Sequence, residues 1–213
     1  MVNMELFDQL LKGDERRLIA QLNSPSKIQA FLDQLSYSVG ETYRCPLRVL
    51  RERTAHCFDG ALFAAAALWH LGHPPLILEL LPNDRDDDHL LALYKCHGHW
   101  GALAQSNFVC LRFREPVYRT LRELVLSYFE QFYNVEREKT LRGYTRPLNL
   151  QVFDDVGWMV DDRMLERISD RLDKTRRYSL ITEERKAELS LVDERSFQAG
   201  LLGANKKGLY HPT

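Results

Sequence analysis

The stretch that decides the fold is HCFDGALFAAAALWHLG, residues 56–72. Nearly every position after Cys57 is apolar or small, so a helix formed here would be apolar on all sides and therefore buried. Asp59 falls in the first turn of this helix, where a negative charge is favourable. Gly72 stands just before Pro74 and Pro75, a usual way for a helix to stop. We predict a buried helix from Cys57 to Gly72.

The residues that follow predict a small antiparallel sheet for this helix to pack on. Leu76–Leu81 is a short apolar strand, and an acidic loop over residues 82–88 separates it from a second strand, His89–Lys95. Gly98 then turns the chain, and Trp100–Phe108 is the expected return strand of a hairpin. The predicted fold class is α+β.

The flanking regions are less regular. Apolar residues at helical spacing over Glu5–Leu22 predict one N-terminal helix, and Ser24 caps a second that starts with Pro25. Tyr37–Arg53 is polar and irregular, with no predicted element.

Beyond the hairpin, the pattern predicts mostly helix. Pro116–Tyr133 has an apolar side and a charged side and is expected to cover the sheet. A strand at Leu148–Phe153 and a helix at Asp162–Lys174 follow, and the tail after Thr182 is weakly patterned. We expect one domain over residues 1–213, with N-terminal helices (1–44), a core (45–110) and a C-terminal helical elaboration (111–213).

Composition limits the classes of function. The chain has 213 residues, 45% of them hydrophobic, and 29 Lys and Arg against 30 Asp and Glu, so its net charge is -1. This balance gives no global attraction to nucleic acid or to anionic membranes. The first residues lack a secretory signal, and no apolar run approaches the roughly 20 residues of a membrane span. We expect a cytoplasmic protein that binds neither nucleic acid nor membrane; its oligomeric state is not predicted.

One of the four cysteines has the setting of a nucleophile. A thiolate at the first turn of a helix is stabilised by the positive end of the helix dipole, and Cys57 has this position. His89, at the start of a strand, is the expected base. A third polar group must orient the imidazole, and across the hairpin the register favours Ser106 while the chemistry of the side chain favours Asn107. The predicted catalytic residues are Cys57, His89 and Asn107.

These residues and their order resemble the transglutaminase-like superfamily, papain-like in the broad sense, in its bacterial forms. The resemblance covers roughly residues 45–110 and rests on His56-Cys57-Phe58-Asp59-Gly60-Ala61-Leu62-Phe63 and Asp88-His89-Leu90-Leu91-Ala92-Leu93-Tyr94. It implies a helix beginning at the nucleophile and packed on an antiparallel sheet, together with thiol acyl chemistry. The chain departs from the family after Trp100, where the usual Asp is missing and Ser106 and Asn107 are the only substitutes.

Two hypotheses of function follow. The first is a thiol-dependent enzyme, a protease, amidase, deamidase or transglutaminase, that acts on a peptide, a protein or a small amide without a cofactor. The second is a catalytically silent domain of the same fold that binds a peptide or protein partner, an interpretation suggested by the missing Asp. A metal at Cys96-His97-Gly98-His99 lacks a fourth ligand, and the acidic run Asp84–Asp88 lacks the glycine and terminal glutamate of a calcium loop, so we predict no metal site.

Overall fold

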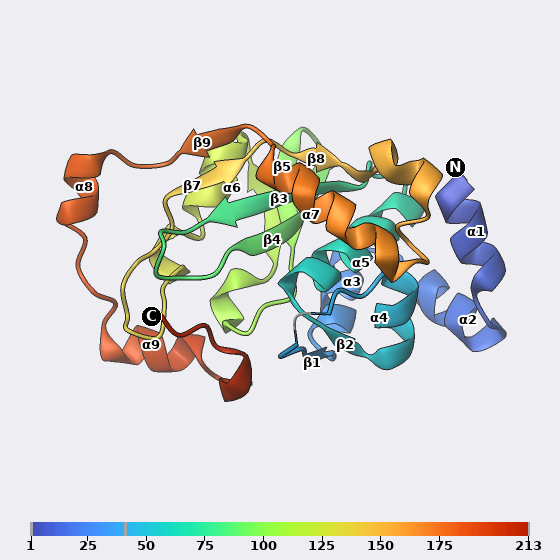
Figure 1. Ribbon diagram of the computed structural model, residues 1–213, viewed down its shortest axis with the longest axis horizontal. Helices are drawn as coiled ribbons and strands as arrows, with labels where there is room; N and C mark the ends of the chain where they lie inside the picture. Colours follow the sequence, from blue (N-terminus) through green and yellow to red (C-terminus); the bar gives the residue numbers. More distant parts are fainter. Residues whose placement is uncertain (1, 41, 213) are drawn as a thin grey trace.

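The computed structural model describes residues 2–40 and 42–212, and its centre is a seven-stranded sheet (Figure 1). The strands of the sheet are β3 (Leu76–Leu81), β4 (His89–Cys96), β5 (His99–Leu103), β6 (Arg114–Tyr118), β7 (Gly143–Thr145), β8 (Leu148–Asn149) and β9 (Arg177–Ser179). They run in the order β6-β5-β4-β3-β7-β9, β8 also pairs with β3, and every pairing is antiparallel. The architecture is α+β.

Helices precede the sheet, intervene between its strands and follow it. The α-helices are α1 (Val2–Leu10), α2 (Gly13–Gln21), α3 (Pro25–Leu32), α4 (Pro46–Glu52), α5 (Cys57–His70), α6 (Leu121–Leu126), α7 (Leu165–Asp173), α8 (Glu183–Ala187) and α9 (Glu194–Gly200). Five 3-10 turns, at Val109–Leu111, Phe129–Gln131, Leu150–Val156, Asp162–Met164 and Lys206–Gly208, and a short parallel pair, β1 (Ser36–Tyr37) with β2 (Thr54–Ala55), complete the described elements.

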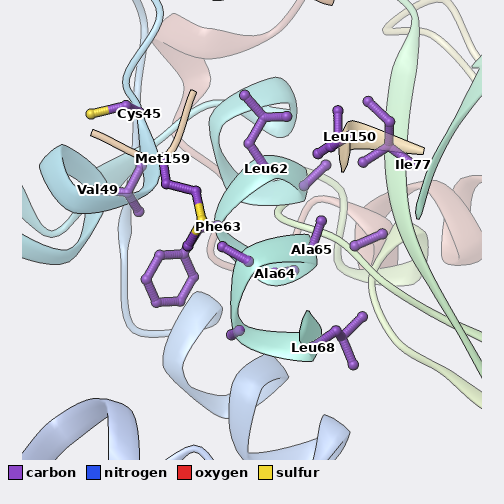
Figure 2. Close-up of a cluster of buried hydrophobic side chains, with 14 of the residues drawn as sticks. Cys45, Val49, Leu62, Phe63, Ala64, Ala65, Leu68, Ile77, Leu150 and Met159 are labelled. Atoms are coloured by element: carbon purple, nitrogen blue, oxygen red, sulfur yellow. The ribbon is translucent and has the colours of Figure 1, made fainter. Parts of the chain in front are cut away.

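The helix α5 is the core of one side of the sheet. It begins at Cys57, ends at His70, and is followed by Gly72 with a φ of +86°, which confirms the predicted helix and its stop. Its alanines and leucines pack on α3, α4 and the inward side chains of β3 and β4 (Figure 2). We call this the α5-side cluster; Figure 2 labels Cys45, Val49, Leu62, Phe63, Ala64, Ala65, Leu68, Ile77, Leu150 and Met159 among its members.

A smaller cluster covers the opposite side of the sheet. Successive strand residues point to opposite sides, so Leu90 and Ala92 join the α5-side cluster while Leu91 and Leu93 join the other. This α6-side cluster contains residues of α6 and the aromatic side chains Tyr128 and Phe132. His89 belongs to the same side by alternation, and its ring lies 6.5 Å from that of Phe132.

Several predicted boundaries were wrong. The expected helix Glu5–Leu22 is two helices, because the chain breaks at Leu11-Lys12 and Glu15 caps the new start by accepting a hydrogen bond from the Lys12 N–H at 2.7 Å. The Ser24 cap is confirmed, with the Lys27 N–H donating to its hydroxyl. The stretch expected to be irregular contains the helix α4, which starts at Pro46.

The C-terminal half differs most from the prediction. Instead of one helix over Pro116–Tyr133, the chain forms the edge strand β6, the short helix α6 and a 3-10 turn. The predicted strand Leu148–Phe153 is two residues of β8 followed by 3-10 helix. Residues 111–213 are therefore not only a helical elaboration, because they supply four strands, β6 to β9, to the central sheet.

Candidate active site

The thiol of Cys57 lies against the start of strand β4, where β4 pairs with β3 but not with β5. The pairing of β4 with β5 begins at Ala92 and Leu103, so the first residues of β4 have no partner in β5. The Cys57 Sγ lies there, 3.9 Å from the Asp88 carbonyl oxygen and in hydrogen-bonding contact with the Leu90 N–H. The side chain thus meets the backbone on both sides of His89.

The start of α5 is held in place by Asp59. This carboxylate is fully buried and accepts hydrogen bonds from the backbone N–H groups of Arg44, at 2.8 Å, and His56, at 3.2 Å. Arg44 Nη1 also lies 3.5 Å from Asp59 Oδ2. Gly60 permits close approach at the next position, since a Cβ there would lie 2.3 Å from the Cβ of Gln105. These contacts fix where Cys57 stands relative to the sheet.

Burial keeps the thiol protonated. Only 2% of Cys57 is exposed, and burial raises the pKa of its thiol well above the usual value. The negative charges of Asp88 and Asp87 add to this increase, while the hydrogen bond from the Leu90 N–H opposes it. The helix position alone therefore does not produce a thiolate in this conformation.

His89 is oriented by a residue that the sequence did not indicate. Its Nε2 lies 2.8 Å from the carbonyl oxygen of Leu111, and a carbonyl can only accept, so Nε2 carries the proton. In the neutral ring Nδ1 is then the acceptor, as a general base requires. The ring is 4% exposed, and burial lowers the pKa of His89 to about 4, so it is neutral at physiological pH.

Neither candidate for the third catalytic residue, both of them within the described part of the chain, forms a hydrogen bond with His89, although both line the same hollow as His89. Ser106 Oγ accepts from the Phe108 N–H at 3.1 Å, and the side chain of Asn107 binds the backbone of Asn205. The Leu111 carbonyl has the orienting role that we expected of Asn107. A backbone carbonyl has no signature in a sequence, so nothing in the residue pattern could have found it.

A second histidine contacts the thiol. The Nδ1 of His56 lies 3.2 Å from Cys57 Sγ, and its ring lies beside that of Tyr37, with centroids 5.2 Å apart. No hydrogen bond between Cys57 and His89 occurs among the described residues, so the structure brings the thiol into contact with His56 and only into proximity with His89. The position of His56 directly before Cys57 in the sequence is the signal that could have indicated it.

Two carboxyl groups, those of Asp88 and Glu79, contact each other near the start of β4. Asp88 is exposed as a residue, but its carboxyl hydrogen-bonds to the buried Glu79. Loss of water around both groups raises their pKa values, and the contact between them requires one proton to be shared. This pair carries less negative charge than two separate carboxylates would.

Two hollows open beside these residues. The first, which we call the His89 hollow, is lined by His89, Asp86, Asp87, Asp88, Asn107, Phe132 and others. The second, the His56 hollow, is lined by His56, Asp87, Tyr43 and Thr42. Tyr37 borders the first, and residues 208–210 of the C-terminal segment line both.

Within residues 2–40 and 42–212, no group of three or more His, Cys, Asp or Glu side chains is arranged to hold a metal ion. The same described residues include no helix that is both long and apolar enough to cross a membrane.

Comparisons with known proteins leave the family open. No protein-family model matches the chain, and no curated protein matches it. A solved structure of Legionella pneumophila LapG is 13% identical over 78% of this chain and 95% of that chain, with a TM-score of 0.42. LapG treated with EGTA gives the same identity and coverage and a TM-score of 0.41. Values this low describe a distant likeness and do not establish a shared family.

Proposed function

We propose that this protein is a thiol-dependent amide hydrolase or acyl transferase, with Cys57 as the nucleophile and His89 as the general base. The observation that carries the proposal is the hydrogen bond between His89 Nε2 and the Leu111 carbonyl oxygen, 2.8 Å long. It fixes the tautomer in which Nδ1 accepts a proton, next to the strand backbone that the Cys57 thiol already contacts.

The reaction begins from a neutral pair. The thiol proton passes to Nδ1 of His89 as Sγ bonds to the amide carbon, and the free N–H groups of the first turn of α5 stabilise the negative oxygen that forms. The imidazolium returns the proton to the leaving amine, which leaves a thioester on Cys57. Water or a second amine then takes the acyl group.

His56 has a different role in this scheme. Its Nδ1 contacts the thiol in the resting state and keeps Sγ directed toward the helix start rather than toward His89. Replacement of His56 is thus expected to retain the reactivity of the thiol, whereas replacement of His89 removes it.

Thiol labelling tests the proposal directly. Iodoacetamide labelling of each cysteine, followed by peptide mass mapping across pH, is compared for the wild type, His89→Ala, His56→Ala and His99→Ala, the last a control on the hairpin. We expect His89→Ala to slow Cys57 labelling at least tenfold below about pH 7, while Cys96 and Cys110 keep their rates. Equal rates in all four proteins would contradict the assignment, and a loss confined to His56→Ala would move the base to His56.

A second candidate function is a catalytically silent domain that binds a peptide or protein. The observation that favours it is the thiol itself, buried and with its pKa raised well above the usual value. This interpretation predicts Cys57 labelling no faster than that of the other cysteines under every condition, together with measurable peptide binding.

A further inference from the structure

The side chain of Asn107 makes a two-point contact with one residue of the C-terminal segment. Its Nδ2 donates to the Asn205 carbonyl oxygen at 2.8 Å, and its Oδ1 accepts from the Asn205 N–H at 2.7 Å. Both partners are backbone atoms of the same residue. A side-chain amide has the donor and the acceptor that one residue of an adjacent strand would offer, so this contact recognises main chain and not a side chain.

The side chain of Asn107 is buried and its neighbours are held in place. Asn107 is only 6% exposed, and its neighbour Ser106 fixes the local turn by accepting from the Phe108 N–H. Gln105, two residues earlier, is packed against Gly60 at the start of α5. The amide is therefore held rigidly beside the first turn of the helix that carries Cys57.

The segment that Asn107 holds continues across both hollows. Asn205 also donates from its side chain to the Tyr37 carbonyl oxygen at 3.3 Å, which places the segment next to β1, as Figure 1 shows for the dark red end of the chain. Gly208 lies so close to Tyr37 that a Cβ would be 2.9 Å from the ring carbon Cδ1. Leu209 and Tyr210 then line the His89 hollow and the His56 hollow together.

The residues along this path carry charges of opposite sign. The hollows are bordered by Asp86, Asp87 and Asp88, and the segment brings Lys207 and His211 to the His56 hollow. A chain with basic side chains beside a glycine suits this surface, because the Asp87 carboxylate lies on the same hollow as the former and the Tyr37 ring admits only the latter.

We infer that Asn107 is a main-chain clamp for a peptide that is extended at the clamped residue and then forms a turn, and that residues 205–211 occupy the place of that peptide within the same molecule. The class of ligand is a basic peptide with a small residue next to Tyr37, rather than a small amide. The inference deepens the proposed function, on which it rests for the reaction that would follow binding. Peptide binding itself does not require a reactive thiol.

Displacement of the segment provides the first test. Gly208→Val places methyl groups where Tyr37 and Val39 leave no room, and Leu202→Ala, at a highly exposed site just before the segment, is the matched control. A fluorescent peptide with the sequence of residues 202–213 is titrated against each protein by anisotropy. We expect Gly208→Val to bind it at least tenfold more tightly than the wild type and Leu202→Ala do, because the bound segment no longer competes.

Chemical variants of the peptide test the clamp without any risk to folding. N-methylation of the residue that corresponds to Asn205 removes the N–H that Asn107 accepts, and it should weaken binding to the Gly208→Val protein about tenfold. Alanine in place of that asparagine keeps the main chain and should cost about threefold or less. Equal affinity of the N-methylated and unmodified peptides, or no binding by Gly208→Val, would overturn the inference.

The two proposals fail in different ways. Tight binding of the peptide with no turnover and no fast Cys57 labelling would leave the clamp standing and remove the enzyme. Turnover of a small amide that the peptide does not inhibit in the Gly208→Val protein would leave the enzyme standing and remove the clamp.

Discussion

The two sides of the central sheet are built differently. The α5 side is covered by a 14-residue helix of alanines, leucines and phenylalanines that is buried along nearly its whole length. The α6 side is covered by a helix of six residues and by aromatic rings, and it includes the titratable ring of His89. The thiol comes from the first side and the imidazole from the second, so the candidate site lies at the end of β4 where the two sides meet. The α5 side therefore positions the candidate nucleophile, and the α6 side contains the candidate base.

Truncation of a buried leucine should lower the free energy of unfolding more on the α5 side than on the α6 side. Leu62 on the α5 side and Leu141 on the α6 side are both fully buried. Leu62→Ala should lower the free energy of unfolding by about 4 kcal/mol and Leu141→Ala by about 3 kcal/mol, since a site within a long rigid helix collapses less around a cavity. Urea denaturation measures both, and a larger loss for Leu141→Ala would reverse the comparison.

Acid should act mainly on the α6 side. The pKa of His89 is lowered from its unfolded value near 6.5 to about 4 by burial. Between these values the unfolded state binds more protons than the folded state, so stability present above pH 6.5 is lost as the pH falls toward 4. The loss is about 3 kcal/mol.

Titration of Asp86 changes stability in the opposite direction, so its contribution must be separated from that of His89. Burial raises the pKa of Asp86 to about 6, so this group favours the folded state as the pH falls through that value. The difference in unfolding free energy between the wild type and His89→Phe, measured from pH 7 to pH 4, isolates His89. His99→Phe is the control, and an unchanged pH dependence in His89→Phe would show that the ring is not buried as described.

The close contact between Gly60 of α5 and Gln105 is expected to give the smallest of these effects on stability. A Cβ at Gly60 would lie 2.3 Å from the Cβ of Gln105, so Gly60→Ala should lower the free energy of unfolding by about 2 kcal/mol. Since the clash moves residues 104–107 away from α5, peptide binding at Asn107 should weaken as well. Gly40→Ala, where no atom lies within 4 Å, is the matched control, and thermal melts of the two variants make the comparison.

Elements with strong local signals were predictable from the sequence. The helix from Cys57, the strand Leu76–Leu81 and the start of the next strand at His89 have the boundaries that their apolar runs and glycine stops indicate. The segment after Pro116 was not predictable, because its apolar residues have helical spacing although its first residues pair with strand β5 as the edge of the sheet. Val117 is 64% exposed in the edge strand β6, and Pro116 is tolerated there because an edge strand leaves some N–H groups unpaired.

For the candidate site, the sequence could indicate side chains but not backbone groups. The residue pattern predicts Cys57 and His89, which stay predictions, and it gives no sign of the Leu111 carbonyl that binds His89, since every residue has a carbonyl. The return strand was expected to reach Phe108, which would place Ser106 opposite His89 and Asn107 next to it. It ends at Leu103, because Gln105 turns in against Gly60, and Asn107 is then free to bind Asn205.

The contact between Asn107 and Asn205 also has a consequence for the order of synthesis. The two residues are 98 positions apart in the chain. At a ribosomal rate of roughly 5–20 residues per second, about 5–20 seconds separate the appearance of the amide from that of the segment that covers it. During this interval the His89 hollow and the His56 hollow lack residues 208–210, which line both of them in the complete chain.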